Sequence, residues 1–211
     1  YDSFDCGRAG TGYVNLYNGD VVIARPLTQC GGNRMPVSIT AYYGAQLSGV
    51  TARVGSHWRL SCDQCMTKSY INDELYFIWS KGDGSQHYFR KPNSSAAYYE
   101  DLSGLSLKLT DNGTYTEIED KGGTVMRFES PQDALDDTGR LLSITDSCGN
   151  TNTFQYGDWR LERITDGAGR VTQFTYSGNM LTGILAPGES APVTMQYSNN
   201  LLSLFMDADG E

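Results

Sequence analysis

Hydrophobic positions in the last third of the chain recur every twenty residues. Two series share this spacing: Leu141, Leu161, Leu181 and Leu201, and Ile144, Ile164, Ile184 and Leu204. A short fixed period is typical of architectures in which each unit is one supersecondary element that buries its apolar face by stacking on its neighbours. The pattern therefore favours a scaffold or a binding surface built from stacked units.

Each unit predicts a β-hairpin. Twenty residues in one strand would span roughly 66 Å at about 3.3 Å per residue, which is too long, whereas two strands of about six or seven residues with two turns fit. The motif Ile-Thr-Asp ends the first strand, Asp-x-x-Gly makes the turn, and Thr-x-Phe-x-Tyr forms the second strand. The predicted turn residues are Asp120, Gly123, Asp146, Gly149, Asp166 and Gly169.

The aspartate and the glycine of this turn have different structural roles. The aspartate caps the turn with its side chain, and the glycine supplies the left-handed backbone conformation. Calcium ligation by the aspartates is the alternative, but one carboxylate per turn is few for that ion. The sequence therefore favours turn geometry.

The apolar residues of the first strand leave one question open. Leu161 and Ile164 are three positions apart and would face opposite sides of a regular strand. Either a β-bulge intervenes or both faces of the sheet carry apolar side chains.

The same hairpin pattern extends upstream with less regularity. Asn18 and Gly19 predict a two-residue type I′ turn between strands within residues 12–25. Further strands are predicted at 36–43, 57–60, 75–79, 86–89, 105–109 and 115–118. A glycine precedes a phenylalanine by five residues at Gly84, Gly123, Gly149 and Gly169.

Two local departures interrupt the pattern. Residues 130–137 carry a capping serine, a proline and early acids, which predict a single helical turn. Pro187 and Gly188 replace the usual Asp-x-x-Gly in the third unit, so that turn is expected to be rebuilt. The predicted organisation is a lead-in at 1–11, a divergent β region at 12–130, a connector at 131–138 and regular repeats at 139–211.

Composition supports this all-β prediction. The chain has 211 residues with 24 Gly, 14 Tyr and only 6 Pro, which suits short strands joined by tight turns. The formal charge of -9, from 25 acidic and 16 basic side chains, disfavours nucleic acid as a partner. No apolar stretch approaches the roughly 20 residues of a membrane span. Since the chain starts without Met and stops within a unit, we expect a fragment of a longer protein whose signal peptide is absent or already removed.

The five cysteines leave several possibilities open. They are Cys6, Cys30, Cys62, Cys65 and Cys148, and an odd count leaves at least one thiol unpaired within the chain. The Cys62 and Cys65 spacing is that of a zinc half-site, which would need a second pair or His57. A disulfide among the first four cysteines and free buried thiols are the alternatives, and free thiols are favoured.

The quoted residues resemble the YD repeats of Rhs proteins, bacterial wall-associated proteins and teneurins. Residues 139–156 read GRLLSITDSCGNTNTFQY, and residues 159–176 read WRLERITDGAGRVTQFTY. Segments within 14–21, 36–43 and 57–60 are similar to the start of many Rhs shells. The resemblance implies consecutive antiparallel hairpins that form a curved, spiralling sheet and a partial shell.

The resemblance also implies a function. We expect a structural segment of a larger exported or cell-surface protein, in which the shell helps to enclose or present a C-terminal toxin or effector that this sequence does not contain. The expected partner is the remainder of its own polypeptide, whose cargo would contact the inner face, and glycans or other cell-surface proteins are further candidate partners. No cofactor is expected.

Two other function classes are alternatives. An adhesion or carbohydrate-binding module would use a sugar-stacking platform drawn from Tyr42, Tyr43, Trp58, Trp79, Tyr98, Tyr99 and Trp159, although aromatic residues of β proteins lie in the core more often than in ligand sites. An enzyme is disfavoured because no nucleophile motif is present and the acidic pairs at 100–101 and 136–137 are adjacent residues, which point apart on a strand.

Overall fold

The computed structural model describes residues 2–17, 19–45, 47, 52–133 and 137–210. The prediction of an all-β protein with antiparallel sheets is confirmed, because every strand pairing is antiparallel and the described part contains one short 3-10 helix, Gly7–Ala9. The strands are β1 (Asp2–Asp5), β2 (Thr11–Val14), β3 (Val21–Thr28), β4 (Ile39–Gly44), β5 (Trp58–Leu60), β6 (Cys65–Ile71), β7 (Glu74–Ser80), β8 (Gln86–Arg90), β9 (Tyr99–Asp101), β10 (Lys108–Asp111), β11 (Tyr115–Glu119), β12 (Val125–Glu129), β13 (Thr138–Thr145), β14 (Thr151–Gly157), β15 (Arg160–Thr165), β16 (Val171–Ser177), β17 (Met180–Leu185), β18 (Val193–Ser198) and β19 (Leu201–Met206).

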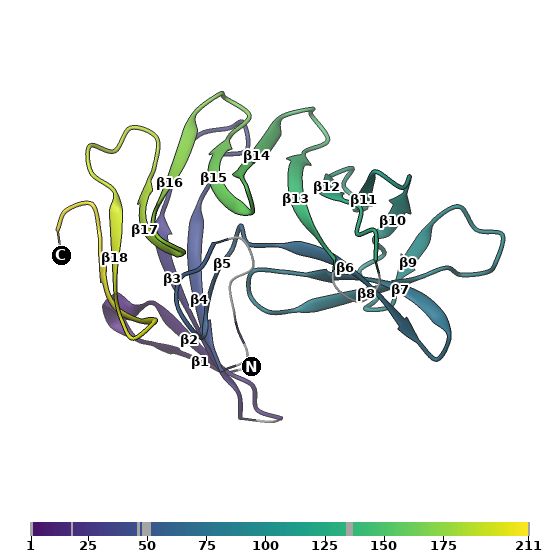
Figure 1. The fold of residues 1–211 in the computed structure, drawn as a ribbon, viewed down its shortest axis with the longest axis horizontal. Coiled ribbons are helices and arrows are strands. Elements are labelled where there is room, and N and C mark those ends of the chain that lie inside the picture. The colour runs from purple at the N-terminus through teal and green to yellow at the C-terminus, as the bar shows by residue number, and fades with distance from the viewer. Residues whose placement is uncertain (1, 18, 46, 48–51, 134–136, 211) are drawn as a thin grey trace.

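These strands form two sheets (Figure 1). The first contains β1 to β5 in chain order. The second contains β6 to β19, and its first eight strands close into a barrel because β13 pairs with both β12 and β6. Strands β14 to β19 continue from β13 as an open sheet.

Strand β13 is the branch point between the barrel and the open sheet. Its first part pairs with β6 at Thr138, Gly139 and Arg140. Its last part pairs with β12 on one side and with β14 on the other. The single spiralling sheet expected from the sequence is therefore a closed barrel with an open sheet attached, and a separate five-stranded sheet. The β6 to β13 pairing joins segments about seventy residues apart, as Met66 with Gly139, and a local repeat pattern carries no information about such closure.

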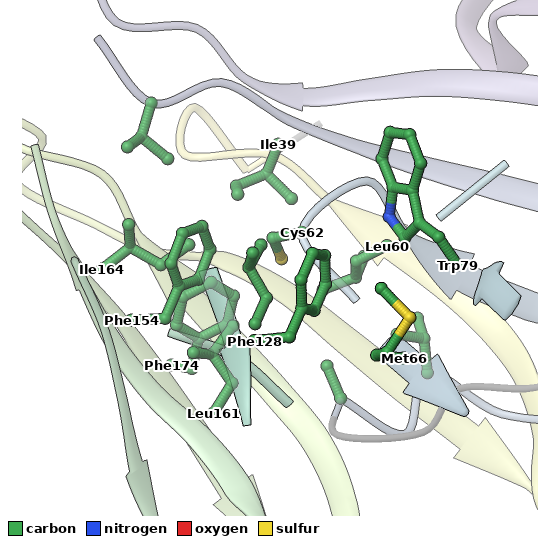
Figure 2. Close-up of a cluster of buried hydrophobic side chains, with 14 of the residues drawn as sticks. Ile39, Leu60, Cys62, Met66, Trp79, Phe128, Phe154, Leu161, Ile164 and Phe174 are labelled. Carbon is green, nitrogen blue, oxygen red and sulfur yellow. The ribbon is translucent and has the colours of Figure 1, made fainter. Parts of the chain in front are cut away.

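One core joins the two sheets. Figure 2 shows Ile39 and Leu60 of the first sheet close to Phe154, Leu161, Ile164 and Phe174 of the repeat strands, with Cys62 between them. Backbone contacts fix the same arrangement, since Leu181 N donates to Arg53 O at 2.9 Å. The five-stranded sheet is thus packed against one face of the repeat strands.

The upstream strands lie close to their predicted positions. Ile39 and Ala41 are buried on alternate positions of β4, as the pattern predicts. The predicted strand at 105–109 begins later, at Lys108. Each phenylalanine that follows a turn glycine by five residues is buried: Phe89, Phe128, Phe154 and Phe174.

Two local predictions are wrong. The connection between β2 and β3 spans residues 15–20, with Asn15 N donating to Asp20 O at 2.8 Å, so it is wider than a two-residue turn; Asn18 itself lies outside the described residues. The described residues 130–133 and 137 are not helical, and the rest of the predicted helical turn lies outside the described residues. In place of a helical cap, the Ser130 hydroxyl donates to Asp111 Oδ1 at 2.7 Å.

Candidate functional site

The repeat turns are built around their aspartates. Asp166 Oδ1 accepts hydrogen bonds from the backbone N–H groups of Ala168 and Arg170, both at 2.9 Å. Asp146 and Asp120 accept from their own turns in the same way. The partner glycines Gly123, Gly149 and Gly169 have φ of 80°, 84° and 80°, a conformation that glycine adopts without strain. Each carboxylate is thereby occupied in organising its turn.

These hydrogen bonds lower the carboxyl pKa values. In Asp146 the Asn150 side chain and backbone lower the pKa, and in Asp120 the Thr124 backbone has the largest effect. Burial acts to raise the pKa of Asp166, but hydrogen bonds from Arg170 outweigh it and the net pKa falls. The three turns therefore hold their aspartates in the charged form.

A β-bulge answers the question that the spacing of Leu161 and Ile164 left open. Tyr156 pairs with Leu161 and Gln155 pairs with Arg163, so Glu162 is the extra residue. Both Leu161 and Ile164 are fully buried as a result. The same shift recurs in the pairings of β16 with β17 and of β18 with β19.

Two-residue turns close the hairpins β14–β15, β16–β17 and β18–β19, and the Asp-x-x-Gly turns connect the strands between these hairpins. The hairpins of the structure are thus offset by one strand from the predicted units, and each repeat tyrosine joins its hairpin to the strand before it. The Tyr156 hydroxyl donates to Leu141 O at 2.8 Å, and the Tyr176 hydroxyl donates to Leu161 O at 2.7 Å. Tyr197 makes the equivalent bond to Leu181 O. Burial raises the pKa of all three phenols, so they remain protonated donors. We call this recurring contact the tyrosine interlock.

The fourth unit corrects the twenty-residue series. Tyr197 pairs with Leu202, as Tyr176 pairs with Leu181, so Leu202 and Phe205 hold the core positions assigned by spacing to Leu201 and Leu204. The cause is the rebuilt turn: Ile184 pairs with Val193, nine residues on, whereas Ile164 pairs with Thr172, eight residues on. The longer turn has Gly188 at φ 86°.

Strand β19 ends the sheet as an open edge within the described part of the chain. It pairs only with β18 there. Leu201 and Leu204 are 53% and 44% exposed, and no charged residue or proline lies within the strand. Natural edge strands usually carry such protective residues, so β19 is suited to pairing with another strand.

The seven predicted sugar-stacking residues do not form one platform. Tyr43 and Trp58 are in contact, with ring centroids 5.2 Å apart, and Trp58 also packs on Phe205. Trp79 and Tyr99 are buried in the barrel, only 6% and 9% exposed.

The remaining three aromatic residues lie elsewhere. Tyr98 lies on the barrel, and its hydroxyl donates to Glu100 at 3.2 Å. Tyr42 is half-buried on β4. Trp159 sits at the turn between β14 and β15 beneath the guanidinium groups of Arg53 and Arg160, at 5.0 and 5.8 Å.

The segment from Cys62 to Cys65, which has the CxxC spacing, places both cysteines in the buried interior. The five cysteines are free, and Cys62 and Cys65 are buried whereas Cys148 is exposed. Burial raises the pKa of Cys62, and Arg59 contacts Cys65 Sγ at 3.6 Å. In the described part of the chain no group of three or more His, Cys, Asp or Glu residues is placed to hold a metal ion.

One serine, histidine and aspartate cluster lies on the barrel. Ser103 Oγ lies 3.3 Å from His87 Nδ1, and Asp101 Oδ1 lies 3.8 Å from the same nitrogen. A catalytic relay needs the aspartate and the nucleophile on opposite ring nitrogens. The cluster therefore lacks relay geometry.

The two acidic pairs of the sequence lie at residues 100–101 and 136–137. In the first pair, Asp101 accepts a hydrogen bond from Leu105 N at 2.8 Å and so caps the loop that follows it. In the second pair, Asp136 lies outside the described residues.

Within the described residues, no helix is both long and apolar enough to cross a bilayer. Neither the family models nor the curated proteins include a match to this chain.

Sequence reasoning missed the interlock and the arginines beside it. The Phe-x-Tyr motif was visible, but the hydroxyl's acceptor lies fifteen residues upstream on another hairpin. The arginine that precedes Leu141 and Leu161 was a signal that could have been used, because both arginines reach the next turn.

Proposed function

We propose that this chain is a structural wall segment of a larger exported or cell-surface YD-repeat protein. In that protein the wall helps to enclose or present a C-terminal toxin or effector domain. The tyrosine interlock is the observation that carries the proposal, because it links successive hairpins into a continuous sheet without supplying any chemistry.

The open edge supports the same proposal. Leu202 occupies the position whose carbonyl accepts a tyrosine hydroxyl in the three preceding units. A further hairpin would pair with β19 and supply that tyrosine. The acidic balance of the chain also suits a protein that avoids nucleic acid.

The open edge at β19 allows the proposal to be tested. We expect the isolated chain to self-associate through β19, with a weight-average mass that rises with concentration in sedimentation equilibrium. The double variant L201K/L204K replaces both exposed leucines of β19. It should shift the association equilibrium to the monomer, because lysines on an edge strand oppose the addition of another strand.

The matched control is Leu105→Lys, since Leu105 is also 53% exposed but lies outside the repeats. This variant should associate as the unmodified chain does. A chain that stays monomeric up to millimolar concentration, or a control that dissociates as fully as the edge variant, would contradict the proposal.

An adhesion or carbohydrate-binding module is the second candidate. It is favoured by the Tyr43 and Trp58 contact, in which Tyr43 remains 37% exposed. Titration of neutral oligosaccharides against tryptophan fluorescence tests it, and saturable quenching that Tyr43→Ala removes would support it.

A further inference from the structure

A crevice opens between two successive hairpins of the repeat sheet. The ladder between β15 and β16 ends at the pair Arg163 and Gln173, and beyond it only the Tyr176 interlock joins the two strands. The crevice is about 420 Å³ and is lined by Arg160, Glu162, Arg163, Gln173, Phe174 and Tyr176. This volume lies within the range of small-ligand sites, roughly 300–1,000 Å³.

The preceding unit shows which group an arginine in this position binds. Arg140 donates to Asp158 O at 2.7 Å and lies over the Tyr156 ring at 4.8 Å. Its Nε and Nη2 groups donate to the two oxygens of the Glu129 carboxylate, at 2.7 and 2.6 Å. Two parallel bonds of this kind are the strong, geometrically specific form of carboxylate recognition.

Arg160 repeats this arrangement without the carboxylate. It donates to Gly178 O at 2.7 Å and lies over the Tyr176 ring at 5.3 Å, but it has no ion pair among the described residues. The strand pairings explain the difference. Phe128 pairs with Leu141 as Tyr156 pairs with Leu161, so Gly157 stands where Glu129 stands one unit earlier.

The other lining groups define what else a ligand must offer. Arg163 is exposed and has no ion pair in the described parts of the chain, and the Gln173 amide beside it offers both a donor and an acceptor. Glu162 contributes a carboxylate that repels a pure anion and accepts hydrogen bonds from hydroxyl groups. A fitting ligand therefore combines a carboxylate with several hydroxyls.

We propose that this crevice binds a uronic acid residue of an acidic polysaccharide. The sugar carboxylate takes the place at Arg160 that Glu129 takes at Arg140, with Arg163 as a second cation. The hydroxyls bond Glu162 and Gln173. The site is independent of the wall role and of the Tyr43 and Trp58 pair.

Isothermal titration calorimetry on the whole chain tests the proposal. The probes are trigalacturonate, the neutral trisaccharide maltotriose, a pentaglutamate peptide and inorganic phosphate. We expect saturable binding of trigalacturonate, with each of the other three at least about tenfold weaker.

Two variants locate the site. Arg163→Gln should weaken trigalacturonate binding about tenfold, since a hydrogen bond to a charged group is worth that much or more. Gly157→Glu should abolish binding by supplying an internal carboxylate to Arg160; the added side chain meets only the movable end of Glu162. Arg90→Gln, an exposed arginine on the barrel, is the control and should bind as the unmodified chain does.

Several results would overturn the proposal. No trigalacturonate binding, equal binding of maltotriose or phosphate, or full affinity in Gly157→Glu would each exclude a uronate site at Arg160. Equal binding of pentaglutamate would assign the crevice to acidic peptides instead. Circular dichroism of both variants establishes that any loss occurs in folded protein, and if either is unfolded, Gln173→Ala replaces it and must also weaken trigalacturonate binding, because the proposed site bonds the sugar hydroxyls through Gln173.

Discussion

At the scale of single residues, the Tyr176 hydroxyl has a defined structural task. It satisfies the carbonyl of Leu161 at a point where β15 and β16 no longer pair. Burial of an unpaired carbonyl is costly, so the hydroxyl stabilises the junction between hairpins.

Tyr176→Phe should therefore lower the free energy of unfolding by about 1 kcal/mol, since it removes one hydrogen bond and keeps the ring. Urea denaturation followed by circular dichroism measures the change. Tyr17→Phe is the control, because Tyr17 is 98% exposed, and its stability should be unchanged. Equal stability of the Tyr176 variant and the unmodified chain would show that the hydroxyl does not hold the hairpins together.

At this scale the sequence predicts contacts between neighbouring residues but not contacts between strands. The residue types of Asp166 and Gly169 predict a turn, and the hydrogen bonds that form it close within four residues. The acceptor of Tyr176 and the carboxylate of Arg140 lie on other strands, so no local pattern revealed them.

At the scale of elements, the bulge decides which side chains reach the core. Without a bulge at Glu162, the period-two alternation of β15 would place Leu161 and Ile164, which are three positions apart, on opposite faces. The one-residue insertion is therefore part of the repeat design, and the longer turn before β18 is an insertion of a different kind.

Deletion of Glu162 removes the bulge residue and leaves Leu161 and Ile164 two positions apart, the spacing that a regular strand places on one face, so both side chains stay buried. The free energy of unfolding should therefore fall by less than about 1 kcal/mol. Deletion of Thr175 in β16 is the contrast, because the two aromatic residues that flank it become adjacent and one of them turns out of the core, at a cost of about 2–5 kcal/mol. Guanidinium denaturation of both variants gives the comparison, and similar losses would mean that strand alternation does not decide which side chains reach the core.

At the scale of the whole molecule, the repeated turns make stability depend on pH. The pKa values of Asp120, Asp146 and Asp166 are lowered in the folded chain. Groups with a lowered folded pKa bind fewer protons than in the unfolded chain, so their contribution is full above the unfolded pKa, about 3.9, and is lost as the pH falls through the folded pKa.

We therefore expect the melting temperature to be steady near neutral pH and to fall below about pH 4. Asp166→Asn should lower the melting temperature at neutral pH and make the acid limb shallower, because the charged partner of Arg170 is gone. Glu189→Gln, an exposed residue, is the control and should follow the unmodified chain. A melting temperature that rises on acidification would contradict this account.

The sequence by itself determined the all-β class, the Asp-x-x-Gly turns and the rebuilt turn at Gly188. Each of these depends on bonds within a few residues or on the alternation of a single strand, so the information is local. Only the tertiary structure decided the closure of β6 on β13, the place of Leu202 in the fourth unit, the scattering of the aromatic residues and the difference between Arg140, which pairs with Glu129, and Arg160, which forms no ion pair with the described residues. These depend on which strands meet across long stretches of chain, and that choice is made by burying one shared core.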